Sequence, residues 1–169
     1  MMNLLIDIGN SSAKVAISEN KKIIEDFRFV ELDTDKILDI INEYKIQNSA
    51  LSNVSTNNEK LKKILTENTS FYSFSNEIRI PFNCSYKLTD VGDDRLALMA
   101  AAYYDFPAEN VLVIDMGTCI TYDIKSSNNN YKAGGISPGL RMRIKSISDG
   151  AFKLNEITPT YPESLIAND

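Results

Sequence analysis

Two short segments of the chain place an acid, a glycine and small polar side chains directly after an apolar run. Residues 5–17 read LIDIGNSSAKVAI, and residues 113–124 read VIDMGTCITYDI. Asp7 aligns with Asp115, 108 residues later, a distance that fits a duplicated domain better than a short repeat. Backbone N–H groups and hydroxyls in such turns suit phosphate oxygens, and the neighbouring carboxylate suits an accompanying cation. Two such turns facing each other would form a nucleotide-binding clamp.

Each turn alone has a simpler interpretation. Gly9-Asn10 is a favoured pair in a plain β-hairpin. The second copy, with the same spacing of acid and glycine, favours a shared function over chance. Asp115 also ends the apolar run 111–114, where a carboxylate without a partner is costly.

A third motif is Gly92-Asp93-Asp94-Arg95, at the start of a predicted helix. Acids in a first helical turn complement the helix dipole, and Arg95 could simply be solvated. Alternatively, one carboxylate accepts a proton from an alcohol while Arg95 binds an anionic substrate group bidentately. The residues alone leave both interpretations open.

A fourth motif, residues 134–139, reads GGISPG. We interpret it as a turn that opens a helix reaching about Ser148. Its glycines would allow close approach to a ligand, and the helix N-terminus could face an anion. An ordinary glycine-rich turn is the alternative.

The composition excludes several classes of function. The chain has 169 residues, a net charge of −5 and a pI near 4.8, which argue against nucleic acid or an anionic membrane as the main partner. No apolar run approaches the roughly 20 residues that span a bilayer. The N-terminal apolar stretch is interrupted by Asp7 and lacks a basic leader, so we expect a strand and no signal peptide.

The titratable residues narrow the chemistry further. The chain has no histidine, which removes Ser-His and Cys-His nucleophiles and most zinc chemistry. A general base must therefore be Asp, Glu, Lys or Tyr. Cys84 and Cys119 lack metal-ligand spacing, so a reduced cytoplasmic protein is the simplest expectation.

Hydrophobic periodicity predicts an α/β pattern that occurs twice. We expect strands over 2–8, 13–18, 22–31, 50–54, 111–115, 119–125 and 131–135, and helices over 33–44, 57–67 and 93–104. A polar, strand-poor loop over a site is expected from 68 to 90. We therefore predict an N-terminal domain, 1–107, and a C-terminal domain, 108–169. The second domain is much the shorter, and we expect its final elements to be missing.

Taken in order, the four motifs resemble those of the type III pantothenate kinases, members of the superfamily of acetate and sugar kinases, heat-shock chaperones and actin. The resemblance extends from residue 2 to about residue 150. It implies an α/β fold of duplicated actin-like (ribonuclease H-like) domains, with mixed sheets flanked by helices and the second domain incomplete at the C-terminus. It also implies a homodimer.

The resemblance further implies ATP-dependent phosphorylation of pantothenate, the first step of coenzyme A biosynthesis. Asp94 would be the general base. Asp115 would hold a monovalent cation, potassium or ammonium, and Asp7 is a candidate ligand for the Mg²⁺ that accompanies ATP. The ATP-binding residues would be Asp7, Ile8, Gly9, Asn10, Ser11, Ser12, Ala13, Lys14 and Thr118. The pantothenate-binding residues would be Tyr86, Gly92, Asp93, Asp94 and Arg95.

Two alternatives remain beside this function. One is a different kinase or phosphatase of the superfamily that acts on a sugar or a carboxylate, against which the motif 92–95 argues. The other is a non-catalytic nucleotide-binding regulatory protein. Its main support is the early end of the chain, after a segment, Ser164–Asp169, that in the family is followed by a threonine reaching the partner's pantothenate.

Overall fold

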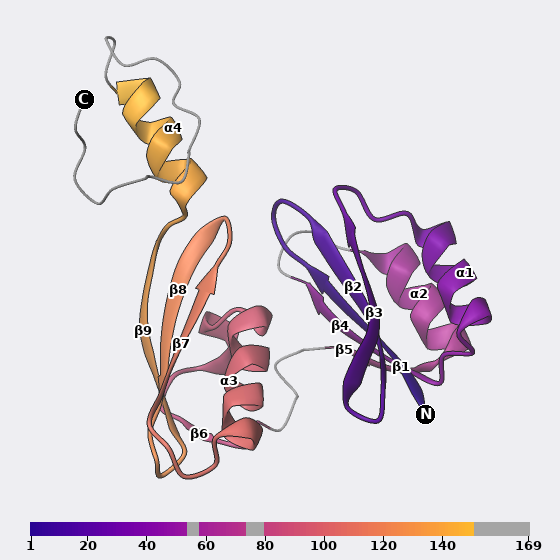
Figure 1. Cartoon of the computed structure of the whole chain (residues 1–169), viewed down its shortest axis with the longest axis horizontal. Helices are drawn as coiled ribbons and strands as arrows, with labels where there is room; N and C mark the ends of the chain where they lie inside the picture. Colours follow the sequence, from indigo (N-terminus) through magenta and orange to yellow (C-terminus); the bar gives the residue numbers. More distant parts are fainter. Residues whose placement is uncertain (54–57, 74–79, 151–169) are drawn as a thin grey trace.

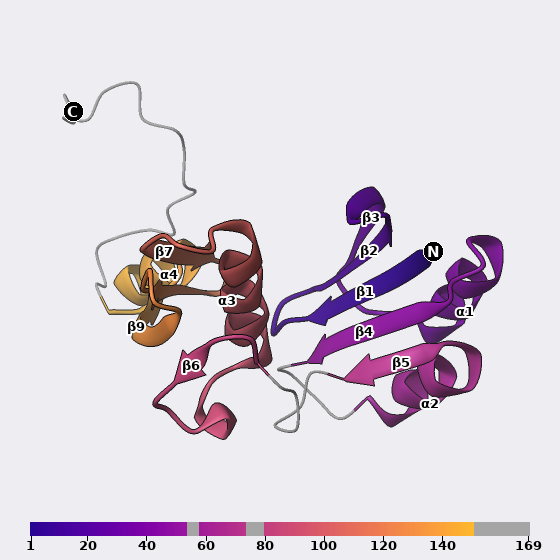
Figure 2. The ribbon, with the colours of Figure 1, turned by 90° about the horizontal axis from the view of Figure 1, so that it is seen from below.

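In the part of the chain that the structure describes, two β-sheets lie on either side of a central helix. The structure is a computed structural model, and it describes residues 1–53, 58–73 and 80–150. Figures 1 and 2 show helix α3 (Asp93–Asp105) between the two sheets in both views. No helix in the described part of the chain is long and apolar enough to cross a membrane.

The first sheet begins with an antiparallel meander. It contains β1 (Met2–Ile8), β2 (Ala13–Glu19), β3 (Lys22–Phe29), β4 (Asn48–Asn53) and β5 (Ser70–Ser73), in the order β3-β2-β1-β4-β5. Strands β4 and β5 run parallel to β1. Parallel neighbours need crossover connections, and helices α1 (Thr34–Glu43) and α2 (Glu59–Asn68) supply them on one face of the sheet.

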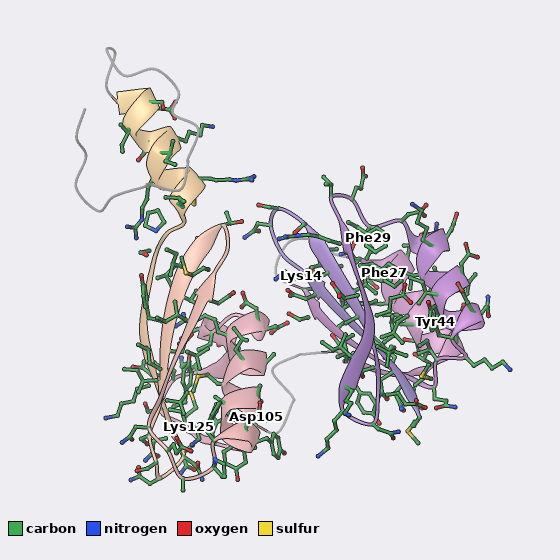
Figure 3. All side chains as sticks on the ribbon, viewed as in Figure 1. Lys14, Phe27, Phe29, Tyr44, Asp105 and Lys125 are labelled. Atoms are coloured by element: carbon green, nitrogen blue, oxygen red, sulfur yellow. The ribbon has the colours of Figure 1, made fainter. Side chains whose placement is uncertain are left out.

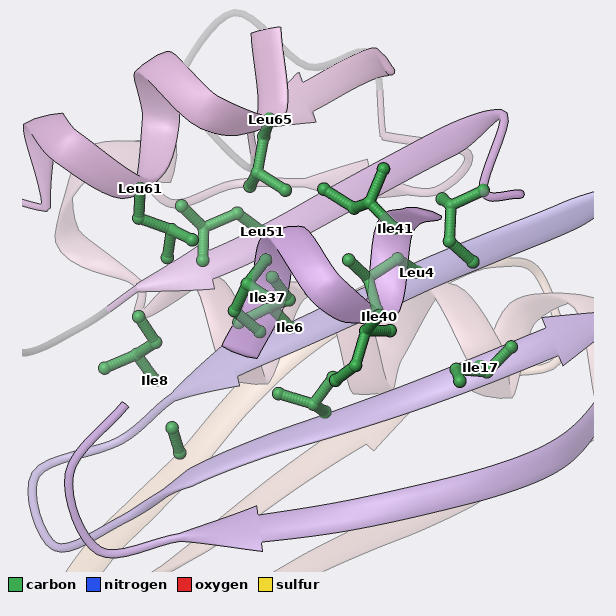
Figure 4. Close-up of a cluster of buried hydrophobic side chains, with 13 residues drawn as sticks. Leu4, Ile6, Ile8, Ile17, Ile37, Ile40, Ile41, Leu51, Leu61 and Leu65 are labelled. Carbon is green, nitrogen blue, oxygen red and sulfur yellow. The ribbon is translucent and has the colours of Figure 1, made fainter. Parts of the chain in front are cut away.

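The main core fills the space between this sheet and its two helices. Alternate residues of β1, namely Leu4, Ile6 and Ile8, are buried, as period-2 alternation in a half-covered strand requires. They pack against apolar residues of α1 and α2, which Figure 4 shows in close-up. Asp33 caps the start of α1, where its carboxylate accepts a hydrogen bond of 2.9 Å from the Asp35 N–H.

The second sheet repeats the meander. It contains β6 (Asn83–Cys84), β7 (Val111–Met116), β8 (Cys119–Lys125) and β9 (Asn130–Pro138), in the order β6-β9-β8-β7. Strands β7, β8 and β9 are antiparallel neighbours in the same arrangement as β1, β2 and β3. A short 3-10 helix (Leu88–Asp90) precedes α3, and α4 (Leu140–Gly150) follows β9. A smaller core, which includes Met99 of α3 and Tyr131 of β9, joins α3 to this sheet.

The two sheets are covered differently. The apolar positions of β1 that face α1 and α2 correspond, 108 residues later, to Leu112, Ile114 and Met116 of β7. These three side chains are 57%, 50% and 73% exposed. Because side chains alternate along a strand, Asp7 and Asp115 lie on the opposite faces of their strands from these positions. The face that carries the acids is the one turned toward α3. Asp7 and Asp115 therefore both face the space between the two sheets, where α3 lies.

The predicted fold class, an α/β arrangement of mixed sheets flanked by helices, is confirmed. Two local expectations are wrong. The region 68–90, expected to be a loop, contains the short strands β5 and β6. A strand of four residues or fewer is too short for its alternation to be recognised in the sequence. Residues 74–79 lie outside the described part. Gly134 and Gly135 belong to β9, as the strand expected over 131–135 implied, so the turn interpretation of the motif 134–139 is wrong for its first residues.

The predicted domain boundary after residue 107 stays a prediction. Two elements before it, β6 and α3, contact the second sheet. The segment Ser164–Asp169 lies outside the described residues.

Candidate active site

The two duplicated turns meet in the folded chain. The hydroxyl oxygens of Ser11 and Thr118 are 2.7 Å apart and share a hydrogen bond, although the residues are separated by 107 positions in the sequence. Each turn is closed by its own glycine: Gly9 N–H donates to the Ser12 carbonyl at 3.1 Å, and Gly117 N–H donates to the Cys119 carbonyl at 2.9 Å. The structure thus brings together two exposed hydroxyls and two glycine turns at one place.

Asp7 lies beside the first turn in a polar environment. One carboxylate oxygen accepts a hydrogen bond from the Ser52 hydroxyl at 3.2 Å, and the other lies 3.4 Å from Lys14 Nζ. Both side chains of the ion pair are substantially exposed, so the pair contributes little to stability and Lys14 can turn toward a bound anion. An open cavity of about 510 Å³ borders these three residues and reaches Ala97 of α3.

The first turn of α3 brings two further acids to the same region. The Asp93 carboxylate accepts a hydrogen bond from the backbone N–H of Asn53, and Asn53 pairs with Ile8 at the end of β1. Burial and the nearby charge of Asp94 raise the pKa of Asp93 above its ordinary value, while the Asn53 hydrogen bond opposes part of this shift. The start of α3 is therefore anchored next to the first turn.

Asp94 folds back over the start of its own helix. Its Oδ1 accepts a hydrogen bond of 2.8 Å from the Arg95 N–H. A Cβ atom on Gly92 would lie 2.5 Å from the same oxygen, so the carboxylate occupies the space that a side chain at 92 would fill. Asp94 is only partly buried, which leaves it accessible to a substrate hydroxyl.

Arg95 is buried and paired. Its Nε donates to Asp123 Oδ2 at 2.9 Å and its Nη2 donates to Asp123 Oδ1 at 2.5 Å. The interpretation in which Arg95 is simply solvated is therefore wrong. A guanidinium has five N–H donors, and this pair uses two of them, so donors on Nη1 and Nη2 remain for another group. Hydrogen bonding to Asp123 raises the pKa of Arg95, which is charged in any case.

Tyr86 is connected to Arg95 through two residues that sequence reasoning missed. The exposed ring of Tyr86 packs edge-on against the ring of Tyr131, with centroids 6.2 Å apart. The Tyr131 hydroxyl donates to Asp123 Oδ1 at 2.8 Å, and burial raises its pKa. The sequence carries no signal for them, because Thr121, Asp123 and Lys125 alternate on one face of β8 like solvent-facing residues, although all three are buried.

The fourth motif touches the second turn. Gly139 N–H donates to the Thr118 carbonyl at 3.0 Å, and a Cβ atom on Gly139 would overlap the carbonyl oxygens of Gly117 and Thr118. Gly139 therefore permits a close approach to another turn of the protein, and the approach to a ligand expected from the sequence stays a prediction. The first backbone hydrogen bond of α4, from Arg143 N–H to the Gly139 carbonyl, starts at the same point.

The site provides oxygen ligands for a cation but no complete metal cage. Among the described residues, no three His, Cys, Asp or Glu side chains gather to hold a metal ion. Mg²⁺ is commonly held by one or two carboxylates together with substrate phosphates and water. Asp7 and Asp115, each partly buried beside a glycine turn, fit a site that nucleotide phosphates would complete.

Comparison with known proteins identifies the family. The sequence profile of the type III pantothenate kinase family matches residues 3–169. The chain belongs to the type III pantothenate kinase family. A type III pantothenate kinase of Christiangramia forsetii is 36% identical over 170 residues, which cover 99% of this chain and 70% of that protein. The type III pantothenate kinase of Phocaeicola vulgatus is also 36% identical, over 96% of this chain and 70% of its own length.

A solved structure shares the fold. A Campylobacter jejuni protein, described as a Baf family transcriptional activator, superposes with a TM-score of 0.54 and 30% identity. The superposition covers 95% of the present chain and 68% of the Campylobacter jejuni protein. The arrangement of two sheets around α3 is thus shared with an experimentally determined structure.

Proposed function

We propose that this protein phosphorylates pantothenate with ATP, the first step of coenzyme A biosynthesis. The observation that carries the proposal is the hydrogen bond between the Ser11 and Thr118 hydroxyls, which joins the two duplicated turns. Family membership, and the fact that the similar proteins are named type III pantothenate kinases, support the same reaction. The reaction would take place in the cytoplasm.

ATP would bind through its phosphates at the paired turns. The donors there would be the hydroxyls of Ser11, Ser12 and Thr118, together with those backbone N–H groups of the first turn that are not used in pairing β1 with β2. Lys14, now 3.4 Å from Asp7, is the nearby cation that can move to a phosphate oxygen. The N-terminus of α4, which starts beside Thr118, adds a favourable dipole for an anion.

Asp94 would accept the proton of the substrate's primary hydroxyl. Phosphoryl transfer depends mainly on positioning and on charge neutralisation, so one carboxylate base is sufficient. Asp93 lies next to Asp94 but is held by the Asn53 backbone, which assigns it to anchoring the helix. Gly92 leaves room for the Asp94 carboxylate, and Arg95 and Tyr86 supply a cation and an aromatic wall for pantothenate.

Asp7 would hold Mg²⁺ and Asp115 a monovalent cation, potassium or ammonium. When bound, these ions neutralise phosphate charge that would otherwise repel the attacking oxygen. The protein's own contribution is to place both carboxylates on the α3 side of their sheets. A homodimer is part of the proposal and follows from the family resemblance alone.

The proposal is tested by coupled measurement of ADP release with ATP, Mg²⁺, potassium and pantothenate. Wild-type protein should show pantothenate-dependent turnover. The substitution Asp94→Asn should lower kcat by at least about 10²-fold, the usual size of a general-base contribution, while the Kd for ATP stays within about twofold. Asp90→Asn, an exposed acid just before α3, is the matched control and should behave like wild type.

The same experiment separates the alternatives. If the wild-type protein binds ATP but releases no ADP in response to pantothenate, the kinase proposal fails and a nucleotide-binding regulatory protein is favoured. If Asp94→Asn retains turnover while Asp93→Asn loses it, the base is Asp93. Turnover with a sugar or a carboxylate in place of pantothenate would point to another kinase of the superfamily.

A further inference from the structure

We propose that Asp123, supported by Tyr131, is a positioning residue that aims Arg95 and Tyr86 at the anionic end of the substrate. The inference rests on the proposed function, because it concerns how that substrate is held. It adds two residues, one on β8 and one on β9, to a site otherwise built from the turns and the start of α3.

The geometry of the pair leaves Arg95 one free edge. Asp123 binds the side of the guanidinium formed by Nε and Nη2. The second Nη2–H and one Nη1–H point in parallel along the outer edge, and that pair has the spacing that suits a carboxylate. The side chain of Arg95 is 10% exposed, so little of it other than such an edge is available to a ligand. Fixing one edge on Asp123 therefore decides where the other edge points.

Burial makes this orientation rigid. Asp123 is only 1% exposed, and a buried carboxylate is tolerated only when it is paired and hydrogen-bonded. Its Oδ1 receives both Arg95 Nη2 and the Tyr131 hydroxyl, and its Oδ2 receives Arg95 Nε. Rotating Arg95 away would leave a buried charge without its partner, so the guanidinium is held in one position.

The contacts of Asp123 and Tyr131 also reach Tyr86, the proposed aromatic contact for pantothenate, and Asp94, the proposed base. Tyr131 packs edge-on against both Tyr86 and Phe82, so the residue that supports Asp123 also supports the Tyr86 ring. On the other side, the Arg95 N–H donates to Asp94. Loss of the Asp123 charge should therefore disturb pantothenate binding first and the base second, and should leave the ATP turns unaffected.

The test compares Michaelis constants for the two substrates in full-chain variants. Asp123→Asn keeps the shape of the side chain and removes its charge. We expect it to raise KM for pantothenate roughly 10- to 100-fold, the scale of a lost charged hydrogen bond, while KM for ATP stays within about twofold. Tyr131→Phe keeps both ring contacts and should raise KM for pantothenate by about 3- to 10-fold.

A destabilising control separates positioning from loss of structure. Met99→Ala removes a fully buried side chain from the same helix and the same small core. It should lower Tm at least as much as Tyr131→Phe does, without changing the ratio of the two KM values. If Asp123→Asn only lowers Tm, or raises both KM values equally, Asp123 has a purely structural role and the proposal is overturned.

A second comparison shows whether Asp123 acts through Arg95. Arg95→Lys keeps the charge but loses the planar fork. If Asp123 works by orienting that fork, the double variant Asp123→Asn/Arg95→Lys should have about the same KM for pantothenate as Arg95→Lys alone. Fully additive effects on KM would contradict the proposal.

If the wild-type protein releases no ADP, the kinase proposal fails, and calorimetric pantothenate binding replaces KM in the same comparison. Absence of pantothenate binding by the wild type would overturn both.

Discussion

Asp94 depends on the absence of a side chain at Gly92. We expect Gly92→Ala to push the carboxylate aside, because the new Cβ would lie 2.5 Å from Asp94 Oδ1. Misplacing a catalytic group by about 1 Å can cost on the order of 10²-fold in rate, so kcat should fall about 10- to 100-fold. Because Gly92 has an extended, negative φ, the fold should tolerate alanine and Tm should change little.

The matched control for this substitution is Gly150→Ala, since nothing lies within 4 Å of a Cβ at that position. It should match the wild type in kcat. Steady-state kinetics and thermal melts of the two variants decide the outcome. Wild-type turnover in Gly92→Ala would show that the position of the carboxylate is not critical.

Asp93 makes stability depend on pH. Its pKa is raised in the folded protein, so the folded state holds the proton more tightly than the unfolded chain does. Stability from this group is therefore present at low pH and is lost as pH rises from the unfolded-state pKa, near 4, through the raised folded-state pKa. Asn has no charge to desolvate, so Asp93→Asn should melt higher than the wild type at pH 7.

The measurement is Tm for both proteins from pH 3 to pH 8. The gap between them should close toward pH 3, where the wild-type carboxyl is protonated. A gap independent of pH would show that the substitution acts through the Asn53 hydrogen bond instead of through the charge.

The turns that we propose to bind the phosphates could be picked out from the sequence, whereas the residues that we propose to orient Arg95 could not. Asp7 and Asp115 stand out because their motif occurs twice. Asp123 is 28 residues from Arg95, and only the packing of α3 on β8 brings them together. From the sequence, an alternation of Thr, Asp and Lys in a strand indicates a solvent-facing surface. The opposite is true here, since that face of β8 is the buried one.

Helix α3 is held to β8 at both of its ends. The N-terminal connection is the pair of Arg95 with Asp123, and the C-terminal one is made by Lys125, two residues further along β8. Lys125 is fully buried, and its Nζ donates to the carbonyls of Phe106 and Glu109 at 2.7 and 3.1 Å. Figure 3 shows Lys125 next to Asp105 at this end of the helix. One strand thus fixes both ends of the element that carries the proposed base.

Removing the C-terminal connection should destabilise the protein. Lys125→Met keeps the approximate length of the side chain but leaves the carbonyls of Phe106 and Glu109, in partly buried hydrogen bonds, without their donor. We expect a loss of about 1–3 kcal/mol in the free energy of unfolding. Urea unfolding of this variant and of Lys132→Met, an exposed lysine on neighbouring β9, makes the comparison. The Lys132 variant should unfold like the wild type. Equal midpoints for all three proteins would mean that Lys125 contributes no net stability.

Most elements followed from periodicity, and the exceptions have physical causes. Strands of the two meanders and the helices α1, α2 and α3 show clear period-2 or helical spacing. Strand β5 was missed because its four residues pair only with β4 at the edge of the sheet, where burial is incomplete. Gly134 and Gly135 read as a turn because strands rarely contain adjacent glycines; a Cβ at 134 would lie 2.7 Å from the Tyr122 carbonyl of β8.

At the scale of the molecule, duplication explains where the candidate site lies. Each half supplies one sheet, one acidic strand end and one glycine turn, and α3 lies between the two acid-bearing faces (Figures 1 and 2). The repeated motif was enough to predict a pair of turns. It did not indicate that the apolar face of the second sheet would be exposed at Leu112, Ile114 and Met116, because covering a face depends on other elements of the chain.

The contact between the halves makes a last prediction possible. If the two turns bind the same phosphates, Ser11 and Thr118 should affect ATP affinity jointly. Each single substitution to alanine should weaken ATP binding by about 3- to 10-fold, from the loss of one hydroxyl hydrogen bond. The double variant should lose less than the product of the two effects, with a coupling energy of about 1 kcal/mol, because each single change already breaks the 2.7 Å hydrogen bond.

The measurement is the calorimetric Kd for ATP with Mg²⁺ in the four proteins of the double-mutant cycle, namely the wild type, Ser11→Ala, Thr118→Ala and the double variant. Ser12 supplies a control from the same turn, since its hydroxyl accepts from Arg28 at 3.3 Å and does not contact Thr118 in the described structure. The effects of Ser12→Ala and Thr118→Ala should multiply without coupling. If the effects of Ser11→Ala and Thr118→Ala on the Kd for ATP also multiplied without coupling, the two turns would not share one nucleotide. Two side chains that contact each other and the same ligand are expected to show coupled effects on its binding.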